Sequence, residues 1–374
     1  MKKDRALFKA VAALIGTVIG AGVLGIPYAV QHVGFPGAII LMITVSVIMV
    51  ILQLMFAEIT LRTPSDHQIP GYSKMYIGPL AKRIAFVVGV IAGYGTLFAY
   101  VLGQGAVLST LFGGSEFMWS VVFLVAGSAV IYRGIRAVMN SELRLTGFIF
   151  LVVLIIGVFS VPYLNLDQVM YVNFEDVLSP YGVLVFAFSG IAVIPQIRKK
   201  LKGHEKNFTK AILLGNALVF ALYAFFTFIV LGVTGVYTTQ IATIGLGQAI
   251  GRYMIVLGDV LAFFTISTSF ITIGMALRRV FQFDYGLKRL HALVLTISVP
   301  FILLILQLSS FIQVLTLVGG VLIGIQAIII ILSFWKAGEK GARKPEFALG
   351  RLRVVGAALI IIFALGAIAT LGVM

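Results

Sequence analysis

The sequence contains no cysteine, and charged residues are scarce in it. Of its 374 residues only 11% are charged, with 13 acidic residues against 28 lysines and arginines. The absence of cysteine excludes disulfide bonds, thiolate zinc sites and cysteine nucleophiles. Short segments with regular polar and apolar alternation are also absent, which argues against a transmembrane β-barrel.

Long hydrophobic runs dominate the chain instead. Hydrophobic residues make up 60% of it, too many for a water-soluble domain of this size. Runs of about 20 apolar residues recur along the whole length, and each is long enough to cross a hydrocarbon core as a helix. We therefore predict an all-α membrane protein with about eleven transmembrane helices. The predicted helices cover residues 5–31, 34–61, 81–111, 117–133, 137–163, 178–201, 207–235, 252–281, 288–306, 310–335 and 352–373.

The formal net charge of +15 would suggest a nucleic-acid partner if the protein were soluble. Here the basic residues gather in alternate loops between the predicted helices, as the positive-inside rule requires. This pattern argues against a nucleic-acid partner and makes the lipid bilayer of the cell membrane the expected surroundings. It places the N-terminus in the cytoplasm and the C-terminus outside. Because no A-x-A-like cleavage site follows the first helix, we expect that helix to be retained and not removed as a signal peptide.

Two short segments of similar sequence indicate an internal repeat. Gly22-Val-Leu-Gly-Ile-Pro27 and Gly190-Ile-Ala-Val-Ile-Pro195 both fit the pattern G-[VI]-x-x-I-P. Both place glycine and proline inside a helical run, so we expect helices 1 and 6 to be discontinuous. Five helices separate the two starts, and an odd number reverses the orientation in the membrane, so we predict two inverted halves. Within a single transmembrane domain, 1–374, the first repeat covers 5–163, the second covers 178–335, and 352–373 is an extra helix.

The strongest local signal is Gly16-Thr-Val-Ile-Gly-Ala-Gly-Val-Leu-Gly-Ile-Pro27. Four glycines within ten residues weaken the helix, and backbone groups freed at membrane depth are tolerated where they line a polar cavity. Half-helix ends then offer amides to a carboxylate and carbonyls to a cation. Gly16-x-x-x-Gly20 is also a helix-packing motif, and Gly20-x-Gly-x-x-Gly25 matches a dinucleotide fingerprint without the strand that should precede it. The second interruption, at Phe186-Ala-Phe-Ser-Gly190, favours a substrate site over packing.

These two interruptions resemble those of the amino acid/auxin permease branch of the amino acid–polyamine–organocation superfamily. The resemblance rests on G-T-x-I-G-A-G-[VI]-L-x-[IL]-P in the first helix and F-A-F-x-G in the sixth. It implies the LeuT-type fold, with 5+5 inverted helices, and a secondary transporter that moves an amino acid by alternating access.

The resemblance also implies where the substrate binds. The α-carboxylate is expected at the backbone amides of Gly20, Ala21 and Gly22. The α-ammonium is expected at carbonyls of the sixth helix. These belong to Phe186, Ala187 and Ser189.

The expected walls of this pocket are apolar and uncharged, which favours a neutral amino acid, hydrophobic or aromatic. Relatives often carry a histidine directly after the sixth-helix glycine, whereas this chain has Ile191 there. For the aromatic and polar residues of the third helix, ordinary packing is an equal alternative. The residues that we expect to line the pocket are Thr17, Ala21, Tyr94, Tyr100, Gln104, Phe186, Phe188 and Ile191.

The sequence suggests no cofactor other than a coupling ion, and sodium is the first candidate. Thr265, Thr268 and Ser269 share one face of the eighth predicted helix. Their oxygens, with the carbonyls of Gly16 and Ile19, would form a sodium site as in sodium-coupled proteins of this fold. The alternative is that the hydroxyls bond carbonyls of their own helix.

Protons are the second possible coupling ion. Glu58 and Asp259 are the main acidic residues inside predicted spans, and an ionisable residue at membrane depth is a candidate for protonation or gating. Glu58 has an alternative, a local ion pair with Arg62 four residues later. The sequence leaves sodium and protons open.

Other classes of function fit less well. An enzyme would need a nucleophile with a base, or metal ligands, that converge within the membrane. The four histidines lie in loops or at span ends, and no H-E-x-x-H motif occurs. A channel would show a filter loop or rings of charge. An amino acid sensor that binds substrate without moving it remains the alternative to a transporter, because fold does not fix function.

Overall fold

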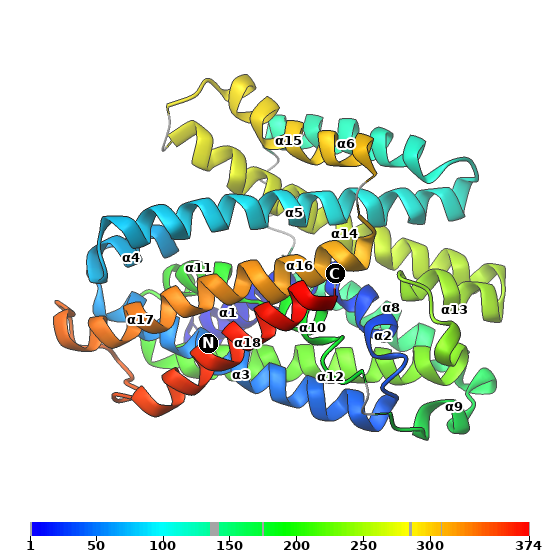
Figure 1. The fold of residues 1–374 in the computed structure, drawn as a ribbon, viewed down its shortest axis with the longest axis horizontal. Coiled ribbons are helices and arrows are strands. Elements are labelled where there is room, and N and C mark those ends of the chain that lie inside the picture. Colours follow the sequence, from blue (N-terminus) through cyan, green and yellow to red (C-terminus); the bar gives the residue numbers. More distant parts are fainter. Residues whose placement is uncertain (1, 135–141, 174–175, 284–285, 308, 374) are drawn as a thin grey trace.

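The protein is a bundle of helices, shown in Figure 1. The computed structural model describes residues 2–134, 142–173, 176–283, 286–307 and 309–373. Ten helices in this part of the chain are long and apolar enough to cross a membrane, and the bent pair at residues 5–30 makes eleven. The predicted all-α membrane fold is therefore confirmed, although the first five residues of the predicted helix 137–163 lie outside the described residues.

The helices are numbered as in Figure 1. The first half comprises α1 (Lys2–Val18), α2 (Gly22–Val30), α3 (Phe35–Arg62), α4 (Ile69–Tyr76), α5 (Pro79–Phe112), α6 (Glu116–Arg133), α8 (Glu142–Ser160) and α9 (Leu166–Met170). The second comprises α10 (Tyr181–Ala187), α11 (Ile194–Lys200), α12 (Phe208–Thr234), α13 (Ala242–Ile250), α14 (Arg252–Phe283), α15 (Arg289–Leu306), α16 (Phe311–Leu317), α17 (Gly324–Lys340) and α18 (Arg353–Val373).

Local sequence explains where several of these helices begin and end. Pro79 stands in the first turn of α5, where the missing N–H costs nothing. Ser310 forms a capping box with Gln313 at the start of α16. Gly134 ends α6 with a φ of 69°, a left-handed conformation that favours glycine. The short helices α4, α9 and α13 connect spans.

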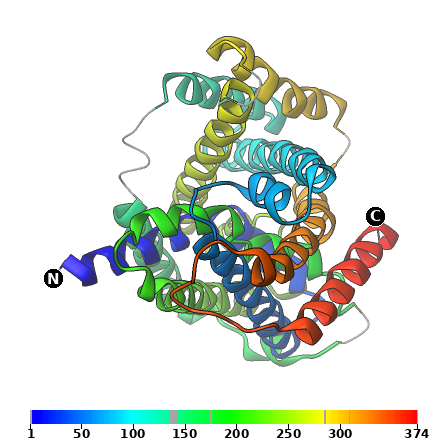
Figure 2. The same cartoon turned by 90° about the vertical axis from the view of Figure 1, so that its left-hand side faces the viewer.

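The long helices surround the two interrupted ones. In Figure 2, α6, α14 and α15 gather on one side of the bundle, and α3 and α12 lie on the other. The helix α5 packs against α6, α14, α15 and α16, while α12 packs against α1, α2 and α3. The last helix, α18, lies at the edge of the bundle against α17 (Figure 2). The interrupted segments are thus held between the two groups.

The tenth span contains an irregularity that the sequence did not predict. A π-helical segment, Val318–Ile323, separates α16 from α17. Here Gly319 crosses Gly182 of α10 so closely that a Cβ on Gly319 would overlap the Gly182 carbonyl oxygen. π-helical turns are rare and often occur at functional sites. This one lies against α10, so the sixth span is a candidate for such a site.

Candidate substrate site

The first span is broken between α1 and α2. The two helices meet at an angle of 55°. The amide of Ile19 still bonds the Ile15 carbonyl at 2.8 Å, and the next backbone bond in this stretch runs from Leu24 to Ala21 at 3.1 Å. Between them, the amides of Gly20, Ala21 and Gly22 make no backbone hydrogen bond to any residue that the structure describes. These are the amides expected to bind a carboxylate, and they are free to do so.

The sixth span is broken after Ala187, the last residue of α10. The amide of Phe188 bonds Leu184 at 2.9 Å and that of Ser189 bonds Phe186 at 3.1 Å, which closes the end of the helix. A 3₁₀ turn, Ile191–Val193, then leads into α11, which has a proline in its first turn. Both predicted discontinuities, in helices 1 and 6, are present.

The two breaks are in direct contact. A Cβ placed on Gly22 would lie 2.7 Å from the Cα and 2.8 Å from the Cβ of Ala187. A Cβ on Gly190 would lie 2.9 Å from a methyl carbon of Val18. These distances are too short for a side chain, so glycine allows the two interrupted backbones to touch. The two segments of similar sequence thus lie against each other in space.

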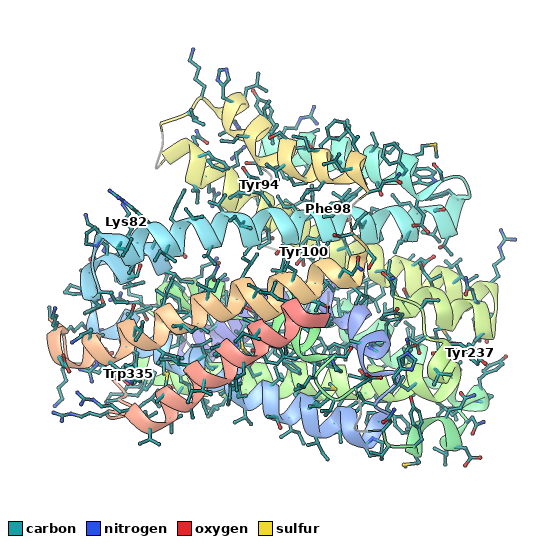
Figure 3. All side chains as sticks on the ribbon, in the orientation of Figure 1. Lys82, Tyr94, Phe98, Tyr100, Tyr237 and Trp335 are labelled. Carbon is teal, nitrogen blue, oxygen red and sulfur yellow. The ribbon has the colours of Figure 1, made fainter. Side chains whose placement is uncertain are left out.

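Two hydroxyl side chains from other helices reach the first break. The position of a Cβ on Gly20 lies 2.9 Å from the Ser269 Oγ and 3.3 Å from the Tyr100 hydroxyl oxygen. Tyr100 therefore lies at the first break. Tyr94 is not, because its hydroxyl donates to the Leu295 carbonyl of α15 at 2.9 Å, and Figure 3 shows it on the other side of α5 from Tyr100. The sequence could not separate these two tyrosines.

The remaining predicted lining residues occupy different surroundings. Thr17 and Phe186 are partly exposed, whereas Ala21, Phe188 and Ile191 are buried. The Phe188 ring packs against α12, with centroid distances of 5.2 Å to Tyr223 and 6.5 Å to Phe220. Phe188 therefore packs the second break against α12.

Sequence reasoning missed Gln53 of α3 and Tyr223 of α12, whose polar side chains bind the second break. The Gln53 side-chain amide donates to the Phe188 carbonyl at 3.3 Å, and Asn216 donates to the Gln53 oxygen at 2.7 Å. The Tyr223 hydroxyl lies 3.2 Å from the Ala187 carbonyl oxygen. Polar residues inside apolar spans were the only signal for them, and that signal does not say which partner each one finds.

Comparison with known proteins shows the family of the chain. Residues 3–373 match the family described as the tryptophan/tyrosine permease family. The chain belongs to this family. It is an integral membrane amino acid permease and not an enzyme, as the motifs of helices 1 and 6 predicted.

Two curated relatives and one solved structure illustrate the match. The permease is 26% identical to tyrosine-specific transport system 1 of Haemophilus influenzae over 95% of this chain and 93% of that protein. It is 27% identical to the tyrosine permease of Enterobacter agglomerans over 62% and 59% of the two chains. Its fold superposes on the crystal structure of MhsT in complex with L-phenylalanine with a TM-score of 0.72, at 14% identity, over 96% and 98% of the chains. The LeuT-type fold is thereby confirmed.

The three hydroxyls predicted to bind sodium have different surroundings in the permease. The Thr265 hydroxyl donates to the Leu261 carbonyl, and the Thr268 hydroxyl donates to the Phe264 carbonyl at 2.8 Å. Both bonds run to the residue four positions earlier, as the alternative expectation described. Ser269 is the member of the stripe that lies at the first break, beside Gly20.

The two acidic candidates of the permease differ sharply. Glu58 is buried, and its two oxygens accept from Arg62 Nε at 2.7 Å and from the Leu349 amide at 2.6 Å. The expected local pair with Arg62 is therefore present, and the loop between α17 and α18 is fastened to the same carboxylate. Asp259 is 0% exposed, and neither of its oxygens has a hydrogen-bond partner among the described residues. Asp259 is thus the unpaired acid inside the bundle.

Replacing Glu58 with alanine is expected to destabilise the permease more than removing an exposed acid. The change leaves Arg62 unpaired and the Leu349 amide without an acceptor, and breaking a buried ion pair costs about 3 kcal/mol. We expect the melting temperature of the purified protein to fall by roughly 3 to 6 °C. Glu339→Ala is the control, because Glu339 pairs with Lys336 and Arg353 at the surface. Equal shifts for the two variants would contradict a structural role for Glu58.

Proposed function

We propose that the permease carries a neutral amino acid with an aromatic side chain, by alternating access at the two breaks. The observation that carries this proposal is the contact between Gly22 and Ala187. It brings the unpaired amides of Gly20, Ala21 and Gly22 next to the carbonyl end of α10. Amides at the start of a helix bind a carboxylate, and carbonyls at the end of a helix bind an ammonium group.

The side chains that meet the two glycines of the first break support a neutral side chain in the substrate. The side chains that meet there, from Tyr100, Ala187 and Ser269, are uncharged. A fixed charge in such a buried site would select a substrate of opposite charge, because unpaired charges are costly inside a membrane. Relatives named for tyrosine transport, and the fold shared with a protein that binds L-phenylalanine, support an aromatic substrate.

Transport is coupled, in this proposal, to either sodium or protons. A sodium ion would use oxygens of Thr265, Thr268 and Ser269 with the carbonyls of Gly16 and Ile19, since hydroxyls that donate to their own helix still offer lone pairs. A proton would use the buried carboxylate of Asp259. The N-terminus lies in the cytoplasm in this proposal, because the basic loops alternate as the positive-inside rule describes.

Thermal stabilisation by ligands tests both substrate and ion. A ligand that binds only the folded protein stabilises it and so raises its melting temperature. At a ligand concentration a hundred times the Kd, the free energy of unfolding rises by about 2.7 kcal/mol. The purified permease would be heated with L-tyrosine, L-tryptophan, L-phenylalanine, L-lysine and L-glutamate, each with sodium or with choline. We expect stabilisation by the aromatic amino acids and none by the charged ones. Stabilisation by L-lysine or L-glutamate alone would contradict the proposal.

A further inference from the structure

The Tyr223 hydroxyl lies where the two interrupted helices end. Its oxygen is 2.9 Å from the carbonyl oxygen of Val18 and 3.2 Å from that of Ala187. Val18 is the last residue of α1, and Ala187 is the last residue of α10. Tyr223 is fully buried on α12, so one side chain from a continuous helix joins the carbonyl ends of both broken ones.

This arrangement places a hydrogen-bond donor between two helix ends that both carry partial negative charge. The carbonyl end of a helix carries a partial negative charge of about half an electron, and its last carbonyls lack partners within the helix. Two such ends meet here inside a span, where water is scarce and unpaired polar groups are costly. A hydroxyl has a single proton, so it donates fully to only one of the two carbonyls at a time. One acceptor is therefore left for a second donor.

The position of the hydroxyl is fixed by its surroundings. The Tyr223 ring packs edge to face with Phe188, the residue directly after Ala187, at a centroid distance of 5.2 Å. Seven residues before Tyr223, on the same face of α12, Asn216 holds Gln53, which donates to the Phe188 carbonyl at 3.3 Å. Two successive carbonyls of the second break, those of Ala187 and Phe188, thus receive donors anchored to continuous helices.

We propose that Tyr223 is a positioning residue of the amino acid site, whose hydroxyl holds the two helix ends together and directs the substrate ammonium to the Ala187 carbonyl. When the substrate ammonium donates to the Ala187 carbonyl, the Tyr223 hydroxyl donates to the Val18 carbonyl alone. Both carbonyls therefore have a full donor only when substrate is bound. This inference rests on the proposed function. It adds a residue outside both interrupted helices that determines how well an ammonium group is bound.

The test replaces Tyr223 with phenylalanine, which keeps the ring and removes the hydroxyl. Tyr94→Phe is the matched control, because Tyr94 also donates to one backbone carbonyl, at 2.9 Å, but on the α15 side of α5. Affinity is measured by competition for L-tyrosine and for 3-(4-hydroxyphenyl)propanoate, which has the same ring and carboxylate without the ammonium group. Melting temperatures without ligand report folding.

We expect Tyr223→Phe to bind L-tyrosine about tenfold more weakly, with the affinity for the propanoate unchanged, because the loss concerns the ammonium site. Tyr94→Phe should retain both affinities within about twofold. An unchanged ratio of the two affinities in Tyr223→Phe would overturn the inference, whatever happens to the melting temperature. If wild type and Tyr94→Phe bind no amino acid, the proposed function fails, and the inference falls with it.

Discussion

Replacing Gly22 with alanine is expected to weaken amino acid binding on the order of 100-fold. The new Cβ would lie 2.7 Å from the Cα of Ala187. A backbone atom cannot turn aside as a flexible side chain does, so the two breaks must separate. Forcing a methyl group into such a packed contact costs about 1 to 3 kcal/mol. That cost falls on the site itself, since the amide of Gly22 is one of the groups expected to hold the carboxylate.

The measurement is the Kd of radiolabelled L-tyrosine for purified protein, with Gly147→Ala as the matched control. Gly147 lies on the exposed face of α8, and a Cβ placed there would meet no atom within 4 Å. Gly147→Ala should therefore bind like the wild type, and both variants should elute as monodisperse protein. Wild-type affinity in Gly22→Ala would show that the substrate does not bind where the breaks meet.

Replacing Asp259 with asparagine is expected to abolish the pH dependence of amino acid uptake. A carboxylate with 0% exposure and no hydrogen-bond partner among the described residues costs several kcal/mol in its charged form. In the proton-coupled form of the proposed function, Asp259 carries the transported proton. Asparagine is similar in shape to the protonated acid and holds no exchangeable charge, so it keeps the structure and removes the proton.

Uptake into proteoliposomes at external pH between about 5 and 8 measures this effect. Linkage to one proton changes uptake by up to about tenfold per pH unit, and the wild type should take up more substrate as the external pH falls. The Asp259→Asn variant should show a nearly flat profile. Asp176→Asn, in an exposed loop before α10, is the control and should keep the wild-type profile. A wild type that depends on sodium and not on pH would instead favour the site beside Ser269.

Hydrophobic length and glycine placement were sufficient to predict the spans and the two breaks. Every predicted span has a counterpart in the described residues, because a segment of about 20 apolar residues satisfies its backbone only as a helix in lipid. The breaks followed from glycine and proline at matching places in the first and sixth spans. The resemblance implied that both breaks contribute to one substrate site, but the contact between Gly22 and Ala187 was visible only in the structure.

The polar partners of the breaks could not be predicted, because they depend on long-range contacts. Tyr223 is 205 residues from Val18 along the chain, and Gln53 is 163 residues from Asn216. Spacing alone predicted the pair of Glu58 with Arg62 but not the bond to the Leu349 amide, 291 residues away. Similarly, helical periodicity placed Thr265 and Ser269 near one face, and only packing placed Ser269 at the first break.

Counterflow of radiolabelled L-tyrosine tests the central claim most directly. Proteoliposomes loaded with unlabelled L-tyrosine are diluted into a trace of labelled L-tyrosine, so that label accumulates only if a carrier exchanges it. We predict accumulation with the wild type and with Gly147→Ala, and none above empty liposomes with Gly22→Ala. Binding without counterflow in the wild type would contradict transport and indicate an amino acid sensor, and counterflow that survives Gly22→Ala would contradict the assignment of the path to the two breaks.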